Sequence, residues 1–314
     1  MNKSTKIRLN YLIGIAVSAV LLGGIYLQVT KQLARVDAGA WWQTGPQAYL
    51  WWCGALMLLN LALEGKKWQM LAGSAEPLSY ARALASCLAG AALSIITPNR
   101  LGDYPGRIMY LRRQNTFRLI SVSVLGSFAQ LLTIFIYGTA ALTYYCVKHP
   151  GPWWPLPALV ASGVLMILLF WCYWRFESWL PLLNKIKWLQ KYKIYAQLLM
   201  RFSPKEQLTI LCISLLRFGI FTAQYLVLLY WMKVQVPVID GFFLSALFFW
   251  VIAVVPSIAL AELGVRGQVG LFLFGMYSAN TIGILSATVG IWLINLVVPA
   301  VAGSLLLLRM KTFR

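Results

Sequence analysis

Long apolar runs constrain this chain more than any other feature of its sequence. Each is long enough to cross about 30 Å of hydrocarbon as a helix. They lie near residues 11–30, 47–63, 119–147, 157–175, 207–232 and 281–308. Charged residues make up only 11% of the chain and the mean hydropathy is +0.73, whereas soluble domains carry roughly 25% charged residues. Because lipid-spanning backbone must satisfy its own hydrogen bonds, the sequence predicts an all-α fold, a polytopic membrane helix bundle.

Two further apolar segments, near 82–97 and 242–256, are shorter and run directly into proline, glycine and charged residues. Such a segment either turns back within the membrane as a re-entrant element or completes another crossing. The sequence therefore predicts six to eight spans, with two broken or re-entrant segments.

The basic residues give the chain a net charge of +19, but they lie between apolar runs rather than on one soluble face. Nucleic acid is therefore not expected as a partner. With six spans and the N-terminus inside, 21 of the 27 Lys and Arg residues fall on the inner side and 5 on the outer side, and Arg217 lies within a span. Because inner loops carry excess positive charge, we expect both termini in the cytoplasm.

A basic stretch at 177–205 divides the chain into halves at roughly 1–176 and 206–314. We interpret this stretch as an interfacial linker inside a single integral membrane domain, residues 1–314. Each half holds one broken segment, and the six-span count places the two breaks on opposite sides. This arrangement is the sequence outline of an inverted repeat, as in many transporters.

The first break, residues 97–107, places charges beside helix-breaking residues. Irregular polar backbone at membrane depth is tolerated only where protein buries it or where it lines a cavity. With Pro105 at the first helical position, free N–H groups beside arginines would form an anion site. The alternative is that these arginines only set topology. The ligand candidates are Arg100, Asp103 and Arg107, and the candidates that shape the backbone are Pro98, Gly102, Pro105 and Gly106.

The second break offers Pro256 and Gly264 as backbone breakers, and it places Glu262 and Arg266 four residues apart. This spacing favours an ion pair on one helix face. A purely structural pair is one reading. Charges inside the membrane are costly and commonly functional, so Glu262 and Arg266 are also ligand candidates.

Polar residues at helical spacing mark two of the long spans. Gln130 belongs to a stripe with Ser127, Thr133 and Tyr137, and Arg217 shares a helix face with Gln224. Such stripes face protein rather than lipid, and interhelical hydrogen bonds explain the hydroxyl groups. Arg217 needs an anionic partner, for which the sequence offers Asp103, Glu262 or a bound phosphate.

No catalytic or metal-binding constellation is visible. The five cysteines are scattered without a C-x-x-C spacing, and His149 is the sole histidine. Walker, G-x-S-x-G and H-E-x-x-H patterns are missing. We therefore expect no metal, no cofactor, no ATP coupling within this chain and no enzyme activity.

Residues 79–107, with the run Pro-Asn-Arg-Leu-Gly-Asp-Tyr-Pro-Gly-Arg, resemble the "P-G-R-x-G-E" element of the lysylphosphatidylglycerol synthase transmembrane family. Pro256 and the Gly264-Val265-Arg266 run, followed by a long last span, resemble that family's "P-x-x-G-V-R-E" element. This family forms the membrane half of the bacterial multiple peptide resistance factor. The resemblance implies a flippase-type domain in the bacterial cytoplasmic membrane, moving an aminoacylated or other anionic lipid.

The chain departs from the family pattern at several positions. Asn99 replaces a glycine, Asp103 a glutamate and Gly267 a glutamate, while Ala129 and Gln130 replace an acid and an arginine. These changes leave the lipid open. The chain also ends at Arg314 without the aminoacyltransferase domain, so lysyl transfer is not implied.

Three functions remain open from the sequence. The leading one is a lipid translocator that binds an anionic head group, aminoacylated or not, between the two motifs. The alternative is an accessory membrane protein that handles polyprenyl-phosphate or glycolipid for a separate glycosyltransferase, and the third is a small-solute permease. The expected partners are membrane lipids with anionic head groups, together with a separate aminoacyltransferase or glycosyltransferase. The lipid, the direction and the oligomeric state stay undetermined.

Overall fold

A computed structural model describes residues 44–95, 97, 102–109, 111, 116–151, 153, 155–175, 202–255 and 262–308, with the single residues Gly23, Tyr26 and Thr30. For Glu262, Leu263 and Leu308 it describes the backbone only. The predicted first span at 11–30 and most of the linker at 177–205 therefore lie outside the described residues.

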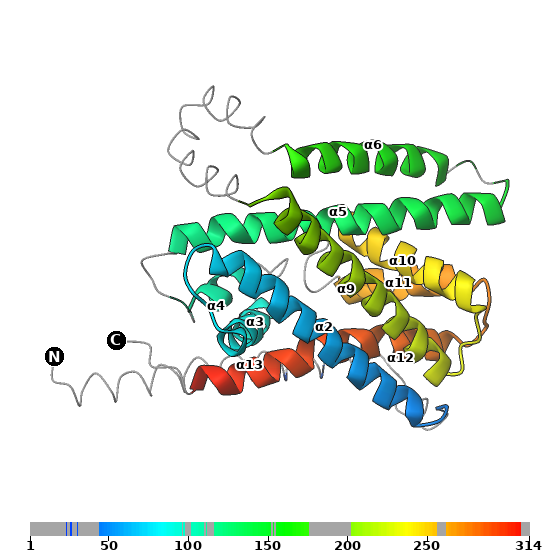
Figure 1. Ribbon diagram of the computed structural model, residues 1–314. Coiled ribbons are helices and arrows are strands. Elements are labelled where there is room, and N and C mark those ends of the chain that lie inside the picture. The colour runs from blue at the N-terminus through cyan, green and yellow to red at the C-terminus, as the bar shows by residue number, and fades with distance from the viewer. Residues whose placement is uncertain are drawn as a thin grey trace.

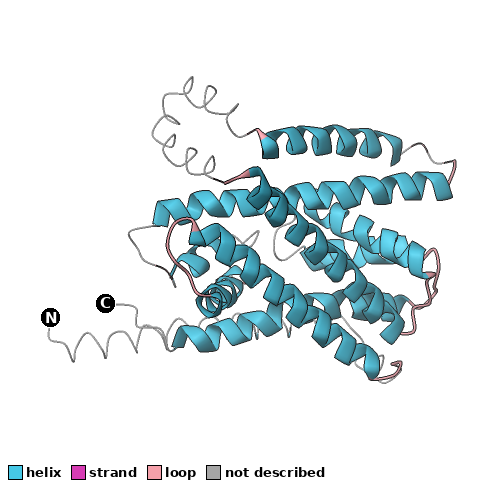
Figure 2. Ribbon diagram, in the orientation of Figure 1, coloured by secondary structure: helices cyan, strands magenta, loops and turns pink. Residues whose placement is uncertain are grey.

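Every regular element in the described part of the chain is a helix, which confirms the all-α class (Figure 2). Among the described residues, five segments are long and apolar enough to cross a membrane, and they coincide with five of the six predicted spans. The helices are α2 (Ala48–Gly73), α3 (Tyr80–Ser94), α4 (Asp103–Met109), α5 (Thr116–Lys148), α6 (Pro155–Trp174), α9 (Pro204–Trp231), α10 (Val238–Val254), α11 (Glu262–Phe274), α12 (Thr281–Trp292), the π-helix η6 (Leu293–Val297) and α13 (Val298–Leu308).

Three helices begin at polar side chains that cap free backbone N–H groups. The hydroxyl groups of Ser79 and Ser203 accept from residues in the first turns of α3 and α9, and Asn280 accepts from Gly283 N at 2.9 Å before α12. These caps fix where the apolar segments begin.

Helices α3 and α4 form an antiparallel pair, here called hairpin 1. The Ser86 hydroxyl on α3 donates to the Arg107 carbonyl on α4 at 2.8 Å. A Cβ added at Gly106 would lie 2.6 Å from the Ala89 carbonyl oxygen, so only glycine permits this approach. The first broken segment thus turns back on itself, as a re-entrant element does.

The start of α4 differs from the sequence prediction. The helix begins at Asp103, so Pro105 is its third residue rather than its first. The turn before it is held by Thr97, whose hydroxyl oxygen accepts from Gly102 N at 2.7 Å. Because Thr97 already serves as this acceptor, the chain enters the helix two residues earlier than Pro105 predicts. The predicted anion site at the start of this helix stays a prediction.

Helices α10 and α11 pack against each other as the second broken segment, here called hairpin 2 (Figure 1). Hairpin 1 connects the end of α2 to the start of α5, whereas hairpin 2 connects the end of α9 to the start of α12. Since α2 and α9 run in opposite directions in Figure 1, the hairpins enter from opposite faces of the bundle. We call these the hairpin 1 face and the hairpin 2 face.

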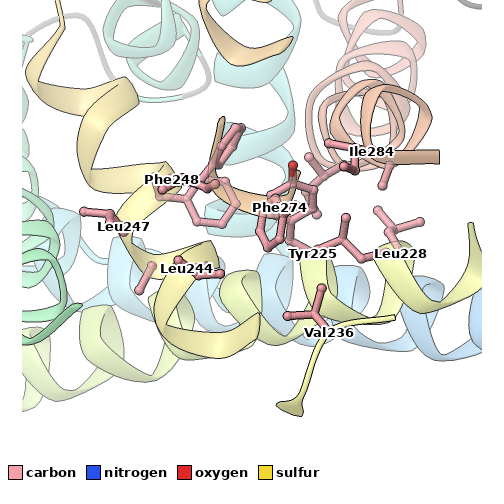
Figure 3. Close-up of a cluster of buried hydrophobic side chains, with 14 of the residues drawn as sticks. Tyr225, Leu228, Val236, Leu244, Leu247, Phe248, Phe274 and Ile284 are labelled. Carbon is pink, nitrogen blue, oxygen red and sulfur yellow. The ribbon is translucent and has the colours of Figure 1, made fainter. Parts of the chain in front are cut away.

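Each hairpin has its own apolar core. Around hairpin 1, buried side chains from α2, α3, α5 and α9 include Trp68, Cys87 and Leu125. Around hairpin 2, the core is aromatic: Tyr225, Phe248 and Phe274 pack together, as Figure 3 shows.

Each hairpin also packs on a span of the other half. Hairpin 1 lies against α13, where a Cβ at Gly303 would overlap the carbonyl oxygen of Leu88. Hairpin 2 lies against α5, where a Cβ at Gly138 would overlap the Trp250 ring. Helices α2 and α9 pack on each other between them. This exchange of partners agrees with the inverted repeat that the sequence predicts.

Candidate functional site

One carboxylate, Glu64 on α2, binds three cations from three helices. Its Oε1 accepts from Arg107 of hairpin 1 at 2.6 Å. Its Oε2 pairs with Lys67 of α2 at 3.1 Å and with Arg217 of α9. We call Glu64, Lys67, Asp103, Arg107 and Arg217 the Glu64 cluster.

Asp103 and neutral side chains complete the coordination of the two arginines. Arg107 Nη2 pairs with Asp103 at 2.7 Å, one helical turn away on α4. Arg217 Nε donates to Asn60 Oδ1 at 2.8 Å, and its Nη1 donates to Gln130 Oε1 at 3.4 Å. The structure therefore brings together Asp103, Arg107, Arg217 and Gln130, four of the predicted site residues.

The anionic partner of Arg217 is a correction. The sequence offered Asp103, Glu262 or a phosphate, whereas the structure gives Glu64. Glu64 was missed because its predicted span ended at residue 63, and Lys67 was counted as a loop charge. Both lie within α2, and Lys67 is buried. One signal was available: Asn60, Glu64 and Lys67 recur at the spacing of a single helix face.

An aromatic residue supports the Arg107 side chain. The guanidinium carbon lies 5.3 Å from the centroid of the Trp68 ring, within cation–π distance. The Trp68 indole N–H donates to Ser86 at 2.9 Å, and Ser86 in turn holds the Arg107 carbonyl. Side chain and backbone of Arg107 are thus fixed by the same small network.

The Glu64 cluster lies well inside the membrane-spanning length. Glu64 is nine residues before the end of α2, which is about 13 Å along a helix axis. The side chains of Lys67 and Glu64 are 5% and 10% exposed, whereas those of Arg217 and Asp103 are 20% and 29% exposed. The cluster therefore has a buried base and a partly open side.

The predicted polar stripe on α5 faces protein, as expected. Ser127 shares a hydrogen bond with the Tyr104 hydroxyl at 2.7 Å, and Tyr137 donates to the Leu215 carbonyl at 3.3 Å. Thr133 is buried and bonds back to the Ala129 carbonyl of its own helix. Two of these contacts, those of Ser127 and Tyr137, are interhelical bonds, and the third lies within α5; together they explain the hydroxyl groups without a ligand.

Gln224 lies in a second polar network, farther along α9. Its amide donates to the Cys53 carbonyl at 2.9 Å and accepts from Asn295 at 2.9 Å. Asn295 belongs to η6, and single π-helical turns often occur at functional positions. The sequence did not single out Asn295.

Arg266 lies apart from the contacts described for the Glu64 cluster. It is buried on α11 and within electrostatic range of Tyr225, whose hydroxyl shares a 2.6 Å hydrogen bond with Thr288. Tyr225 follows Arg217 by eight residues on α9, about 12 Å along the helix. The predicted arginines thus occupy two levels of the bundle.

The remaining candidates divide into two groups. Gly102 and Gly106 occupy close backbone contacts, whereas Gly264 has open space around it. Pro98, Arg100, Pro256 and the side chain of Glu262 lie outside the described residues, so the predicted Glu262–Arg266 pair stays a prediction.

Comparison with known proteins gives a family. A family model described as "Lysylphosphatidylglycerol synthase TM region" matches residues 11–303. No curated protein matches the chain. Since this match covers nearly the whole sequence and the five apolar helices fit it, the chain is a membrane protein that belongs to the lysylphosphatidylglycerol synthase transmembrane family.

Proposed function

We propose that this protein moves phospholipids with anionic head groups, aminoacylated or not, between the two leaflets. The family points to a membrane function related to lipids. The observation that carries the finer proposal is the Glu64 cluster, because it places charges that can bind a phosphate at membrane depth. We assign transport to the chain and no catalytic step.

The charges of the cluster favour an anionic ligand. Three cations, Lys67, Arg107 and Arg217, face two carboxylates, Glu64 and Asp103. With these groups ionised, the cluster carries one excess positive charge. A phosphodiester head group would neutralise it, and the low dielectric of the site strengthens that attraction.

The exposure of the side chains in the Glu64 cluster indicates which partner of Arg107 a phosphate would replace. Glu64 and Lys67 form the buried base, whereas the side chains of Asp103 and Arg217 are the more accessible ones. Arg107 Nε is buried and has no hydrogen-bond partner within the described part of the chain. A phosphate that displaces Asp103 would gain the planar fork of Arg107. The released Asp103 carboxylate would then accept an amine, if the head group carries one.

The arrangement of the hairpins supports passage across the bundle. Hairpin 1 enters from one face and carries Arg107, and hairpin 2 enters from the other and carries Arg266 (Figure 1). The two arginines would hold the phosphate in turn at two depths. Expected partners are the lipids themselves and a separate aminoacyltransferase or glycosyltransferase.

The direct test measures lipid movement in proteoliposomes. Fluorescent anionic, aminoacylated and polyprenyl lipids are compared with protein-free vesicles by quenching the outer leaflet. Arg107→Lys, Arg217→Lys and Arg266→Lys keep the charge but lose the fork, so we expect a loss on the order of tenfold. Arg118→Lys, an exposed residue in the first turn of α5, should leave the rate unchanged.

Two outcomes would overturn the proposal. Rates equal to those of protein-free vesicles for every lipid would remove the transport claim, and binding of polyprenyl-phosphate without movement would favour the accessory function. Equal rates for the parent and all four variants would return the arginines to a role in topology.

In the proposed orientation, the hairpin 1 face and both termini lie on the cytoplasmic side of a bacterial inner membrane. Lys205, at the start of α9, should then lie inside, and Lys233, after its end, outside. In a background without native cysteines, an impermeant thiol reagent added to whole cells should label Lys233→Cys but not Lys205→Cys. The reverse labelling would invert the orientation.

A further inference from the structure

A second charged cluster lies at the hairpin 2 face, far from Glu64. The ammonium of Lys148, the last residue of α5, pairs with the carboxylate Oδ1 of Asp240 on α10. The Tyr144 hydroxyl donates to the same oxygen at 2.7 Å. The ammonium nitrogen also lies 5.7 Å from the Tyr144 ring centroid and 6.0 Å from that of Tyr277.

These groups come from three segments that meet at the base of hairpin 2. Asp240 lies in the first turn of α10, and Tyr277 follows the end of α11. Tyr144 is fixed by stacking on Phe243, with ring centroids 4.3 Å apart. Burial, and after it the charge of Asp240, raises the pKa of the Tyr277 phenol, which keeps its proton at neutral pH. The surroundings of the ammonium are therefore rigid and rich in hydrogen-bonding groups.

The two partners of the ion pair differ sharply in exposure. The Asp240 side chain is 4% exposed, whereas that of Lys148 is 42% exposed. A buried carboxylate without a cation is costly, so the position of the ammonium requires an occupant. Because most of the cost of an empty site falls on Asp240, the Lys148 side chain can leave whenever another cation takes its place.

We propose that Asp240, Tyr144 and Tyr277 form a binding site for a primary ammonium group, which Lys148 occupies in the absence of ligand. A carboxylate with aromatic rings around the nitrogen is a recognised way to bind ammonium ligands. Hydrogen bonds to Asp240 and Tyr144 require N–H groups, so the site selects a primary amine over a quaternary one. The ligand is the amine of a phospholipid head group, such as ethanolamine, or a free alkylammonium.

The location of the site suits a lipid head group. Exposed tryptophans mark the same face: Trp51 and Trp52 near the start of α2 and Trp153 just before α6 are 79%, 64% and 76% exposed. Tryptophan concentrates at the level of lipid head groups. Lys148 lies 18 residues beyond Gln130 on α5, about 27 Å along the helix. The ammonium site is therefore separate from the Glu64 cluster, and it does not depend on the proposed transport.

The test uses the full chain in nanodiscs of matched acyl chains, with either phosphatidylcholine alone or added phosphatidylethanolamine. Lys148→Met empties the site while keeping the length of the side chain. We expect this variant to unfold at a lower temperature in phosphatidylcholine and to recover toward the parent with phosphatidylethanolamine. Ethylammonium added to phosphatidylcholine nanodiscs separates a free amine from a lipid source.

Two controls keep the result specific. Lys205→Met, an exposed lysine at the opposite face, reports the general effect of each lipid. The double variant Lys148→Met with Asp240→Asn should show no recovery by either amine. If Lys148→Met does not fold, Lys148→Gln repeats the measurement, since glutamine is polar but neutral and still leaves the Asp240 carboxylate without a cation.

Recovery by either amine source that depends on Asp240 supports the site and assigns its ligand. Unfolding temperatures that stay the same with and without both amines would overturn it, and the Lys148–Asp240 contact would then be an internal ion pair only. Recovery that persists in the double variant would also overturn it.

Discussion

Replacing Glu64 with glutamine tests the centre of the bundle most directly. The substitution keeps the shape of the side chain but removes the negative charge shared by Lys67, Arg107 and Arg217. Asp103 still pairs with Arg107, and Arg217 keeps its bonds to neutral amides. Lys67, only 5% exposed, loses its carboxylate.

The burial of Lys67 sets the size of the expected loss of stability. Removing one partner of a buried ion pair costs about 3–5 kcal/mol. Since glutamine can still accept a hydrogen bond and Asp103 remains, we expect Glu64→Gln to lower the free energy of unfolding by about 3 kcal/mol, at the lower end of that range. Adding Lys67→Met on the Glu64→Gln background should restore part of the loss, because it removes the cation left without a carboxylate. The coupling energy between the two substitutions should reach at least about 1 kcal/mol.

The assay is reversible unfolding in mixed micelles, followed by tryptophan fluorescence. Glu206→Gln serves as the matched control, because Glu206 is exposed and glutamine also suits the third position of its capping box. We expect that variant to stay within about 0.5 kcal/mol of the parent. A Glu64→Gln protein that also stays within that margin would refute the reasoning that Glu64 holds these helices together.

Two further substitutions test the packing of the bundle. Gly303→Ala places a methyl group against the Leu88 carbonyl, so it should destabilise the protein by about 1–3 kcal/mol. Its control is Gly163→Ala, which has open space around it and should be neutral or stabilising. Equal effects of the two substitutions in the same unfolding assay would contradict the close approach of hairpin 1 to α13. Gln224→Leu removes both hydrogen bonds of a fully buried amide. It leaves Asn295 with its bond to the Ile291 carbonyl but without the Gln224 acceptor, which should cost about 1–3 kcal/mol. An unchanged unfolding midpoint would show that this network contributes nothing.

The sequence alone determined where the long apolar helices lie in the described part of the chain. Length and apolarity are local properties, so the five described spans follow directly from runs of consecutive residues. The turn of hairpin 1 was also readable, because the break at residues 97–107 combines glycines and prolines with charge. The polar faces of α5 and α9 followed from helical spacing for the same reason.

Local spacing did not give the exact start of α4 or the C-terminal end of α2. Thr97 begins the turn earlier than Pro105 predicts. Glu64 and Lys67 lower the local hydropathy, which made α2 look shorter than the helix that packing stabilises. Helix ends inside a bundle depend on contacts that a hydropathy window does not contain.

Only the tertiary structure decided which charges meet. Arg107 lies 43 residues from Glu64 in sequence, and Arg217 lies 157 residues from Asn60; their contacts depend on how α2, α9 and hairpin 1 pack together. Lys148 and Asp240, 92 residues apart, likewise meet because hairpin 2 packs on α5. A sequence shows that a buried charge needs a partner, but several carboxylates can satisfy that need. The packing of the helices selects one of them, because an ion pair forms only where two side chains reach the same point in space.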